Sequence, residues 1–155
     1  DGELFVSASP LTPHQRAAWN FADFFKDAEQ AGLGMGFFAP VDVVFDQYNI
    51  TVPDLGFVLK DRLAIVTEAN IQGPPDILVE ILSPSTRRRD VGVKMQTYAS
   101  FGVRVYFVVD ARAKTVQPYE LHAGAYTRLS LLTIEDALTC PLLPGISIPV
   151  AKLFE

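Results

Sequence analysis

The sequence predicts an α/β domain in which a mixed central β-sheet is flanked by helices, and two observations lead to this prediction. The run from Pro75 to Asp110 alternates strand, helix and strand, and a unit of this length implies a right-handed crossover between two parallel strands. An amphipathic helix precedes this run, and further short strand-like segments follow it. Because no internal repeat or linker-like segment divides the chain, we expect residues 1–155 to form a single domain.

The composition is that of an ordinary globular protein, with 49% hydrophobic and 20% charged residues. No apolar stretch approaches the roughly 18 residues that span a bilayer, so no membrane segment is expected. The start of the chain also lacks the basic and apolar regions of a signal peptide. The single cysteine, Cys140, excludes an internal disulfide and a cysteine-based zinc site. These features predict a soluble protein of the reducing cytoplasm.

The first helix is expected to begin at Thr12, which is placed as the N-cap, with Pro13 at the first helical position and Gln15 in a capping box. Gly32 and Gly34 supply the stop signal. Apolar residues repeat at helical spacing between these ends: Ala17, Ala18, Phe21, Phe24, Phe25 and Ala28. The helix therefore packs an aromatic face on the core.

Residues 36–45 and 50–59 predict two strands joined as a hairpin by a turn from Asp46 to Asn49, and Asp54 falls inside the second strand. A loop from Asn70 to Pro75 leads into the next strand, residues 77–83.

A helix from about Val91 to Phe101 then follows, with Asp90 as its N-cap and Gly102 as its stop, and the strand 103–110 comes directly after it. The last third predicts strands at 115–121 and 125–132, a short helical turn from Glu135 to Leu138, and an extended piece at 146–154.

Glu80 is the most informative residue, because it lies in a strand that is otherwise apolar on both faces. An ionised carboxylate buried there without a partner would cost several kcal/mol. A metal ion or a lysine is therefore expected beside it.

Two further charged residues lie where structure alone would not select them. Asp54 is placed in an apolar strand, although an aspartate after Pro53 could also be a turn residue. Lys94 lies near the positive end of its helix dipole, although solvation alone could explain it. Together with Glu80 they suggest one site, because two carboxylates can hold Mg²⁺ and a nearby lysine can stabilise charge during phosphodiester hydrolysis.

Other charged residues are candidates for supporting roles. Asp76 shares the face of Glu80, but four residues of strand separate their α-carbons by roughly 13 Å, too far to share one ion easily. The run Arg87, Arg88 and Arg89 predicts a phosphate-contacting patch, with a solvated loop as the alternative.

The chain resembles the PD-(D/E)XK nuclease superfamily and, within it, the Uma-type restriction endonuclease domains. The resemblance covers nearly the whole chain, from DGEL and SPLTPHQR through VPDLGFV to PDILVEILSPSTRRRDVGVKMQTYASFGV and YFVVD. It implies a restriction-endonuclease-like core, with a mixed central sheet flanked by helices, and a metal-dependent nuclease site.

On this resemblance, Pro53 and Asp54 correspond to the PD element and Glu80 to the acidic residue of the next strand. The superfamily usually has a lysine two residues further on, where this chain has Leu82. The resemblance therefore implies that Lys94, on the following helix, takes over the lysine role.

Glu3 and His14 fall within the matching N-terminal region and are possible accessory residues. For His14 the alternative is an ordinary surface or capping residue at the start of a helix.

We therefore expect a metal-dependent endonuclease that hydrolyses phosphodiester bonds in DNA, with Asp54 and Glu80 holding Mg²⁺ or Mn²⁺ and Lys94 as the migrated lysine. DNA is the expected partner, and a homodimer is expected by analogy with the fold. The alternative is a catalytically inactive nuclease-fold domain that serves as a binding or assembly module. The lost lysine at Leu82 and the net charge of −5 favour that alternative.

Overall fold

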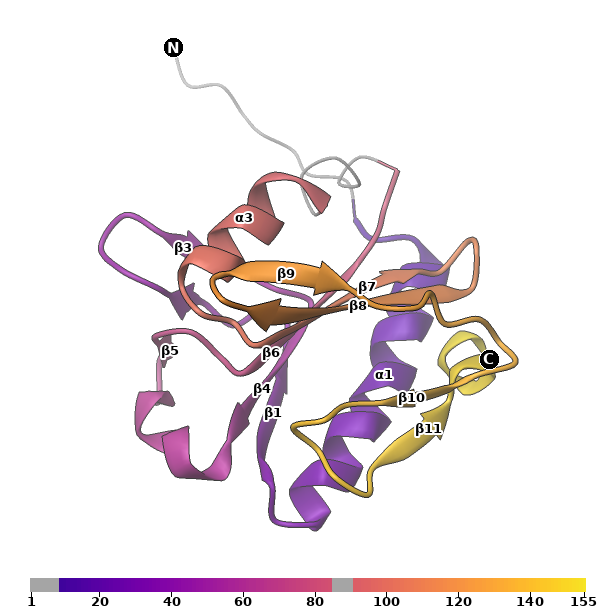
Figure 1. Cartoon of the computed structure of the whole chain (residues 1–155), viewed down its shortest axis with the longest axis horizontal. Helices are drawn as coiled ribbons and strands as arrows, with labels where there is room; N and C mark the ends of the chain where they lie inside the picture. Colours follow the sequence, from indigo (N-terminus) through magenta and orange to yellow (C-terminus); the bar gives the residue numbers. More distant parts are fainter. Residues whose placement is uncertain (1–8, 85–90) are drawn as a thin grey trace.

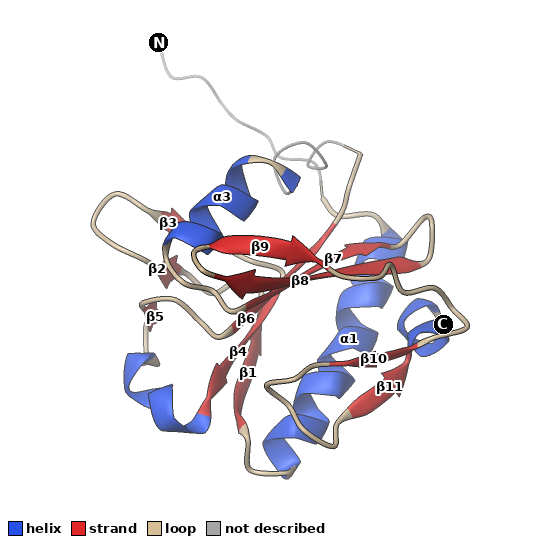
Figure 2. Ribbon diagram, viewed as in Figure 1, coloured by secondary structure: helices blue, strands red, loops and turns tan. Residues whose placement is uncertain are grey.

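Six strands form the main sheet of the computed structural model, which describes residues 9–84 and 91–155 (Figures 1 and 2). The order across this sheet is β1-β4-β6-β7-β8-β9. Its strands are β1 (Gly34–Phe38), β4 (Leu55–Leu59), β6 (Ile77–Ile81), β7 (Val105–Asp110), β8 (Thr115–His122) and β9 (Ala125–Arg128). β6 and β7 are parallel and every other neighbouring pair is antiparallel, so the sheet is mixed, as predicted.

The remaining elements cover the two faces of this sheet. They are α1 (Thr12–Gln30), β2 (Val43–Val44), β3 (Ile50–Thr51), a 3₁₀ helix η1 (Lys60–Ile65), β5 (Ile71–Gln72), α3 (Val93–Ser100), β10 (Ala137–Thr139), β11 (Ser147–Pro149) and a 3₁₀ helix η2 (Val150–Phe154). β2, β3 and β5 form a small three-stranded sheet, and β10 pairs with β11. None of the helices in the described residues is both long and apolar enough to cross a membrane.

α1 follows the prediction except in its first turn, where the predicted capping box is absent and Pro13 is the second helical residue. Leu11 is the N-cap and makes no side-chain capping hydrogen bond, so Thr12 is the first helical residue rather than the cap. The helix ends as expected, because Gly32 adopts a φ of 74° and its backbone N–H donates to the carbonyl of Glu29.

The predicted hairpin is divided between two sheets. β2 and β3 pair across the predicted turn, where the Asp46 carboxylate accepts hydrogen bonds from the backbone N–H groups of Tyr48 and Asn49. The flanking strands β1 and β4 pair with each other in the main sheet instead. Asp54 therefore lies directly before β4 and not inside a strand, which corrects the prediction.

The strand, helix and strand unit is confirmed as β6, α3 and β7, although α3 begins at Val93 instead of Val91. The predicted N-cap, Asp90, lies outside the described residues. In the last third, β8 and β9 are present, but the helical turn predicted from Glu135 to Leu138 is wrong. Glu135 and Asp136 lie in a turn, and Ala137 and Leu138 already belong to β10, where Leu138 pairs with Ile148 of β11.

Two apolar cores lie on opposite faces of the main sheet, and β6 contributes to both. Ile77, Val79 and Ile81 pack with α1, β10, β11 and η2 on one face. Leu78 packs with α3 and the small sheet on the other face. Because side chains alternate along a strand, Glu80 shares the face of Leu78 and points towards α3.

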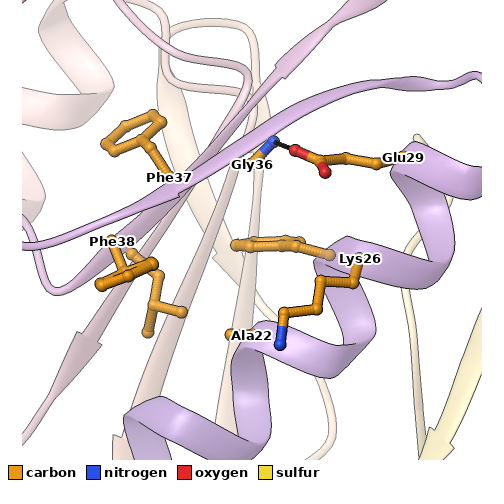
Figure 3. A pocket seen from close by; sticks show the side chains of 8 residues that line it. Ala22, Lys26, Glu29, Gly36, Phe37 and Phe38 are labelled. Carbon is orange, nitrogen blue, oxygen red and sulfur yellow. Dashed lines mark hydrogen bonds between the residues drawn. The ribbon is translucent and has the colours of Figure 1, made fainter.

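The outer edge of β1 is closed by the helix beside it. Figure 3 shows Glu29 of α1 reaching Gly36, whose backbone N–H donates a 2.7 Å hydrogen bond to its carboxylate. This bond satisfies a donor that an edge strand would otherwise expose. The hollow beside it, about 140 Å³, is lined by Lys26, Phe37 and Phe38 among others and by none of the predicted site residues.

Candidate functional site

The start of β4 and the end of β6 bring the two predicted carboxylates together. Leu55 pairs with Val79 in the antiparallel register, so one further residue along each strand places Asp54 opposite Glu80. The Asp54 carboxylate accepts a 2.7 Å hydrogen bond from the backbone N–H of Ile81. This bond holds Asp54 against β6. The Asp54 side chain is 22% exposed.

Glu80 is the buried member of the pair, with only 2% of its surface exposed. Lys94 Nζ lies 2.9 Å from Glu80 Oε1, and the Tyr98 hydroxyl donates a 2.6 Å hydrogen bond to the same oxygen. Both partners come from successive turns of α3. Of the two compensating groups expected from the sequence, a metal ion or a lysine, the lysine is present, and it comes from the helix that packs over the end of β6.

The pKa of Glu80 is raised from 4.5 to about 7. Burial is the largest cause, and the attraction of Lys94 is the strongest opposing effect. The negative charge of Asp54 raises the pKa further, while the Tyr98 hydrogen bond lowers it. A carboxyl group with these surroundings exchanges its proton near neutral pH, and it favours a cation that can replace that proton.

His14 lies in the first turn of α1, next to Asp54. Its Nε2 atom is 3.4 Å from Asp54 Oδ2, and this contact is the largest cause of a raised His14 pKa, against an opposing effect of burial. Its Nδ1 atom is buried and has no hydrogen-bond partner in the described part of the chain. The structure thus brings His14 to the site.

Asp76 lies at the opposite end of β6 and belongs to a separate cluster. It is fully buried, and its Oδ2 atom accepts a 2.8 Å hydrogen bond from the backbone N–H of Leu59. Its Oδ1 atom is 3.0 Å from Arg62 Nη1 and 3.8 Å from Arg104 Nη1. The structure does not bring Asp76 to the site; it joins β4, β6 and the start of β7 instead.

Four predicted residues fall outside the described ranges: Glu3, Arg87, Arg88 and Arg89. Conversely, Tyr98 and Thr51 were not predicted as part of the site. Thr51 Oγ1 lies 3.4 Å from the Tyr98 hydroxyl, on the side of the small sheet. The helical spacing of Lys94 and Tyr98 places both side chains on one face of α3, and this spacing is a signal in the sequence that could have pointed to Tyr98.

Comparisons with known proteins show the family and the fold. The chain matches the family described as "Uma2: Putative restriction endonuclease" over residues 1–151. The chain belongs to this family. It is also similar to the crystal structure of a protein from Anabaena variabilis that is described as a putative nuclease of DUF820, with a TM-score of 0.76 and 17% identity. That match covers 99% of this chain and 87% of the other. No curated protein matches the chain.

The restriction-endonuclease-like fold is thus confirmed. Leu82, where the resemblance implies a lysine in the superfamily, packs as a partly buried residue against the core on the α3 face. Lys94 reaches the Glu80 carboxylate from α3, and the lysine side chain is 19% exposed. A cation therefore lies beside Glu80 although the strand itself carries none.

We expect the metal-free stability of this Uma2 domain to fall as the pH rises from 5 to 8. Glu80 ionises at 4.5 in the unfolded chain and at about 7 in the folded chain, so its contribution is fully present below 4.5 and is lost as pH rises through 7. The difference between these two pKa values corresponds to a loss of about 3 kcal/mol in the free energy of unfolding. Urea unfolding in EDTA at several pH values measures this loss. Glu80→Gln is expected to make the free energy of unfolding depend less steeply on pH.

The slope that remains in Glu80→Gln belongs in part to His14, whose raised pKa acts in the same direction. The exposed Glu68 supplies the control, since Glu68→Gln is expected to retain the wild-type slope. An equal slope in wild type and Glu80→Gln would contradict the raised pKa of Glu80.

Proposed function

We propose that the chain is a metal-dependent endonuclease that hydrolyses phosphodiester bonds in DNA. The observation that carries the proposal is the buried Glu80, held by Lys94 at 2.9 Å, with the Asp54 carboxylate bound at 2.7 Å to the backbone N–H of the next residue, Ile81. A structural role would be met by an apolar residue at lower cost. Membership of a family described as restriction endonucleases supports the same reaction class.

Asp54 and Glu80 would hold the metal ion through their carboxylate oxygens. In the described residues, no group of three or more His, Cys, Asp or Glu side chains is arranged to hold a metal. Two carboxylates fit Mg²⁺ or Mn²⁺ nevertheless, because Mg²⁺ usually keeps several waters and binds through one or two carboxylates plus substrate phosphate. When bound, the ion would polarise the phosphate and activate a water molecule.

The side chains of the site have distinct roles in this proposal. Lys94 places a positive charge beside the phosphate, where negative charge increases as water attacks phosphorus and the alkoxide departs. His14 contacts Asp54 Oδ2, and the Ile81 N–H binds the same oxygen, so these two groups fix the orientation of the carboxylate. The metal must displace the proton of Glu80, and its affinity is therefore expected to increase as pH rises through about 7.

The test is nicking of supercoiled plasmid DNA in Mg²⁺ and in Mn²⁺. Wild type is expected to nick the plasmid, and Asp54→Ala and Glu80→Ala are expected to lose the activity, while Glu68→Ala, which removes an exposed carboxylate, cuts at the wild-type rate. Addition of EDTA should stop cleavage. A folded wild type that binds metal and leaves plasmid intact would favour the inactive binding module instead. The same assay tests the proposal that DNA is the partner. The homodimer stays a prediction, which light scattering would test.

A further inference from the structure

Tyr98 is buried directly behind the carboxylate of Glu80, and its position is fixed from several sides. Its ring meets Tyr106 of β7 edge to face, with centroids 5.2 Å apart, and Phe45 lies 5.9 Å away. Its hydroxyl contacts Thr51 of β3 at 3.4 Å and donates to Glu80 Oε1 at 2.6 Å. The ring is fully buried, so packing and the Thr51 contact together determine where the hydroxyl lies.

The hydroxyl and the ammonium group act on the same oxygen of Glu80. Tyr98 and Lys94 are four residues apart on α3, so they extend from the same side of the helix. Both contacts fall on Oε1, and neither falls on Oε2. A carboxylate held in this way cannot rotate freely, and its second oxygen has a fixed direction.

We propose that Tyr98 is a positioning residue that holds Glu80 Oε1 so that Oε2 is presented to the metal ion. The inference rests on the proposed metal site but adds a residue that acts through Glu80 without touching metal or DNA. Lys94 and Tyr98 therefore have different roles. Lys94 places a positive charge beside the reacting phosphate, whereas the neutral hydroxyl of Tyr98 only orients the Glu80 carboxylate.

The experiment compares Tyr98→Phe with wild type by calorimetric titration of Mn²⁺ and by plasmid nicking as a function of Mn²⁺ concentration. The phenylalanine ring retains the packing and removes only the hydroxyl. Loss of a group that orients a metal ligand typically lowers metal affinity 10- to 100-fold. We therefore expect the dissociation constant and the half-saturating Mn²⁺ concentration to rise by about tenfold or more, while the rate at saturating Mn²⁺ stays near that of wild type.

Tyr126→Phe is the matched control. The Tyr126 hydroxyl donates a 2.8 Å hydrogen bond to the Val103 carbonyl, within the same aromatic cluster but away from Glu80. Its loss should lower stability and leave the Mn²⁺ midpoint unchanged, as any purely structural tyrosine would. An equal Mn²⁺ affinity in wild type and Tyr98→Phe overturns the inference.

Thr51→Val gives a second variant that does not alter the tyrosine. It removes the hydroxyl partner that lies on the other side of Tyr98, so it should shift the Mn²⁺ midpoint in the same direction by a smaller factor. If Tyr98→Phe does not fold, an unchanged midpoint in Thr51→Val overturns the inference. Failure of the proposed function is distinguishable, because wild type would then bind Mn²⁺ without cutting DNA, and the binding titration would still test Tyr98.

Discussion

Lys94→Ala is expected to lower the rate of plasmid nicking by about 10²- to 10³-fold at saturating Mn²⁺, the effect usual for removing one preorganised group that stabilises a transition state. The ammonium group is 2.9 Å from Glu80 Oε1, so it lies beside the proposed metal and its bound phosphate. Its removal also takes away the strongest effect that lowers the pKa of Glu80. Saturating metal separates these two consequences, because it keeps Glu80 ionised in both proteins.

Two further variants sharpen this result. Lys26→Ala removes an exposed lysine that pairs with Asp23 at 3.4 Å and lies over the Trp19 ring, and it should cut at the wild-type rate. Lys94→Arg keeps the charge but changes its shape, so we expect an intermediate rate. If Lys94→Ala cuts as fast as wild type under saturating metal, Lys94 only neutralises Glu80, and the proposed catalytic role is wrong.

Asp76→Ala is expected to lower the free energy of unfolding by about 3 kcal/mol, which is at the lower end of the cost of breaking a buried ion pair. Asp76 is fully buried and binds the Leu59 N–H, while Arg62 and Arg104 contact its Oδ1 atom. The substitution leaves a backbone donor without its partner and two arginines without theirs. Because both arginines are partly exposed, water can solvate them, and this limits the loss.

Urea unfolding measures this loss, and Asp23→Ala is its control. Asp23 forms an exposed pair with Lys26, so its removal should change the free energy of unfolding by less than about 0.5 kcal/mol. Asp76→Ala should still bind Mn²⁺ when folded, since Asp76 lies at the far end of β6 from Glu80. A change below 1 kcal/mol in Asp76→Ala would mean that the cluster contributes no net stability.

The fold could be predicted where local signals and tertiary structure agree. The aromatic spacing of α1, the glycine at its end and the β6, α3 and β7 unit are all confirmed. The hairpin prediction is right about the turn and about which segments pair, but wrong about continuity, because the pairs β2 with β3 and β1 with β4 belong to different sheets. The chain between β1 and β4 turns aside to form β2 and β3, and no local pattern indicates that a strand changes sheets.

The site was predictable in its charges but not in its arrangement. A carboxylate within an apolar strand is visible in sequence, because burial without a partner is costly, and Lys94 is the partner that the structure supplies. The opposition of Asp54 and Glu80 depends on the strand register, which sequence does not determine. Tyr98 was not assigned to the site because a tyrosine in a helix is most simply explained by packing, and the role of its hydroxyl depends on its contact with Glu80.

α3 has eight residues and only Tyr98 buried, and it provides both groups that hold Glu80. A helix of this length is not stable alone, so it persists through its docking on the sheet and the small sheet beside it. Local opening of such a segment costs less free energy than unfolding of the whole domain. The share of molecules with an assembled site is therefore set by a local equilibrium, and hydrogen exchange of the α3 amides would report that share while the central sheet remains protected.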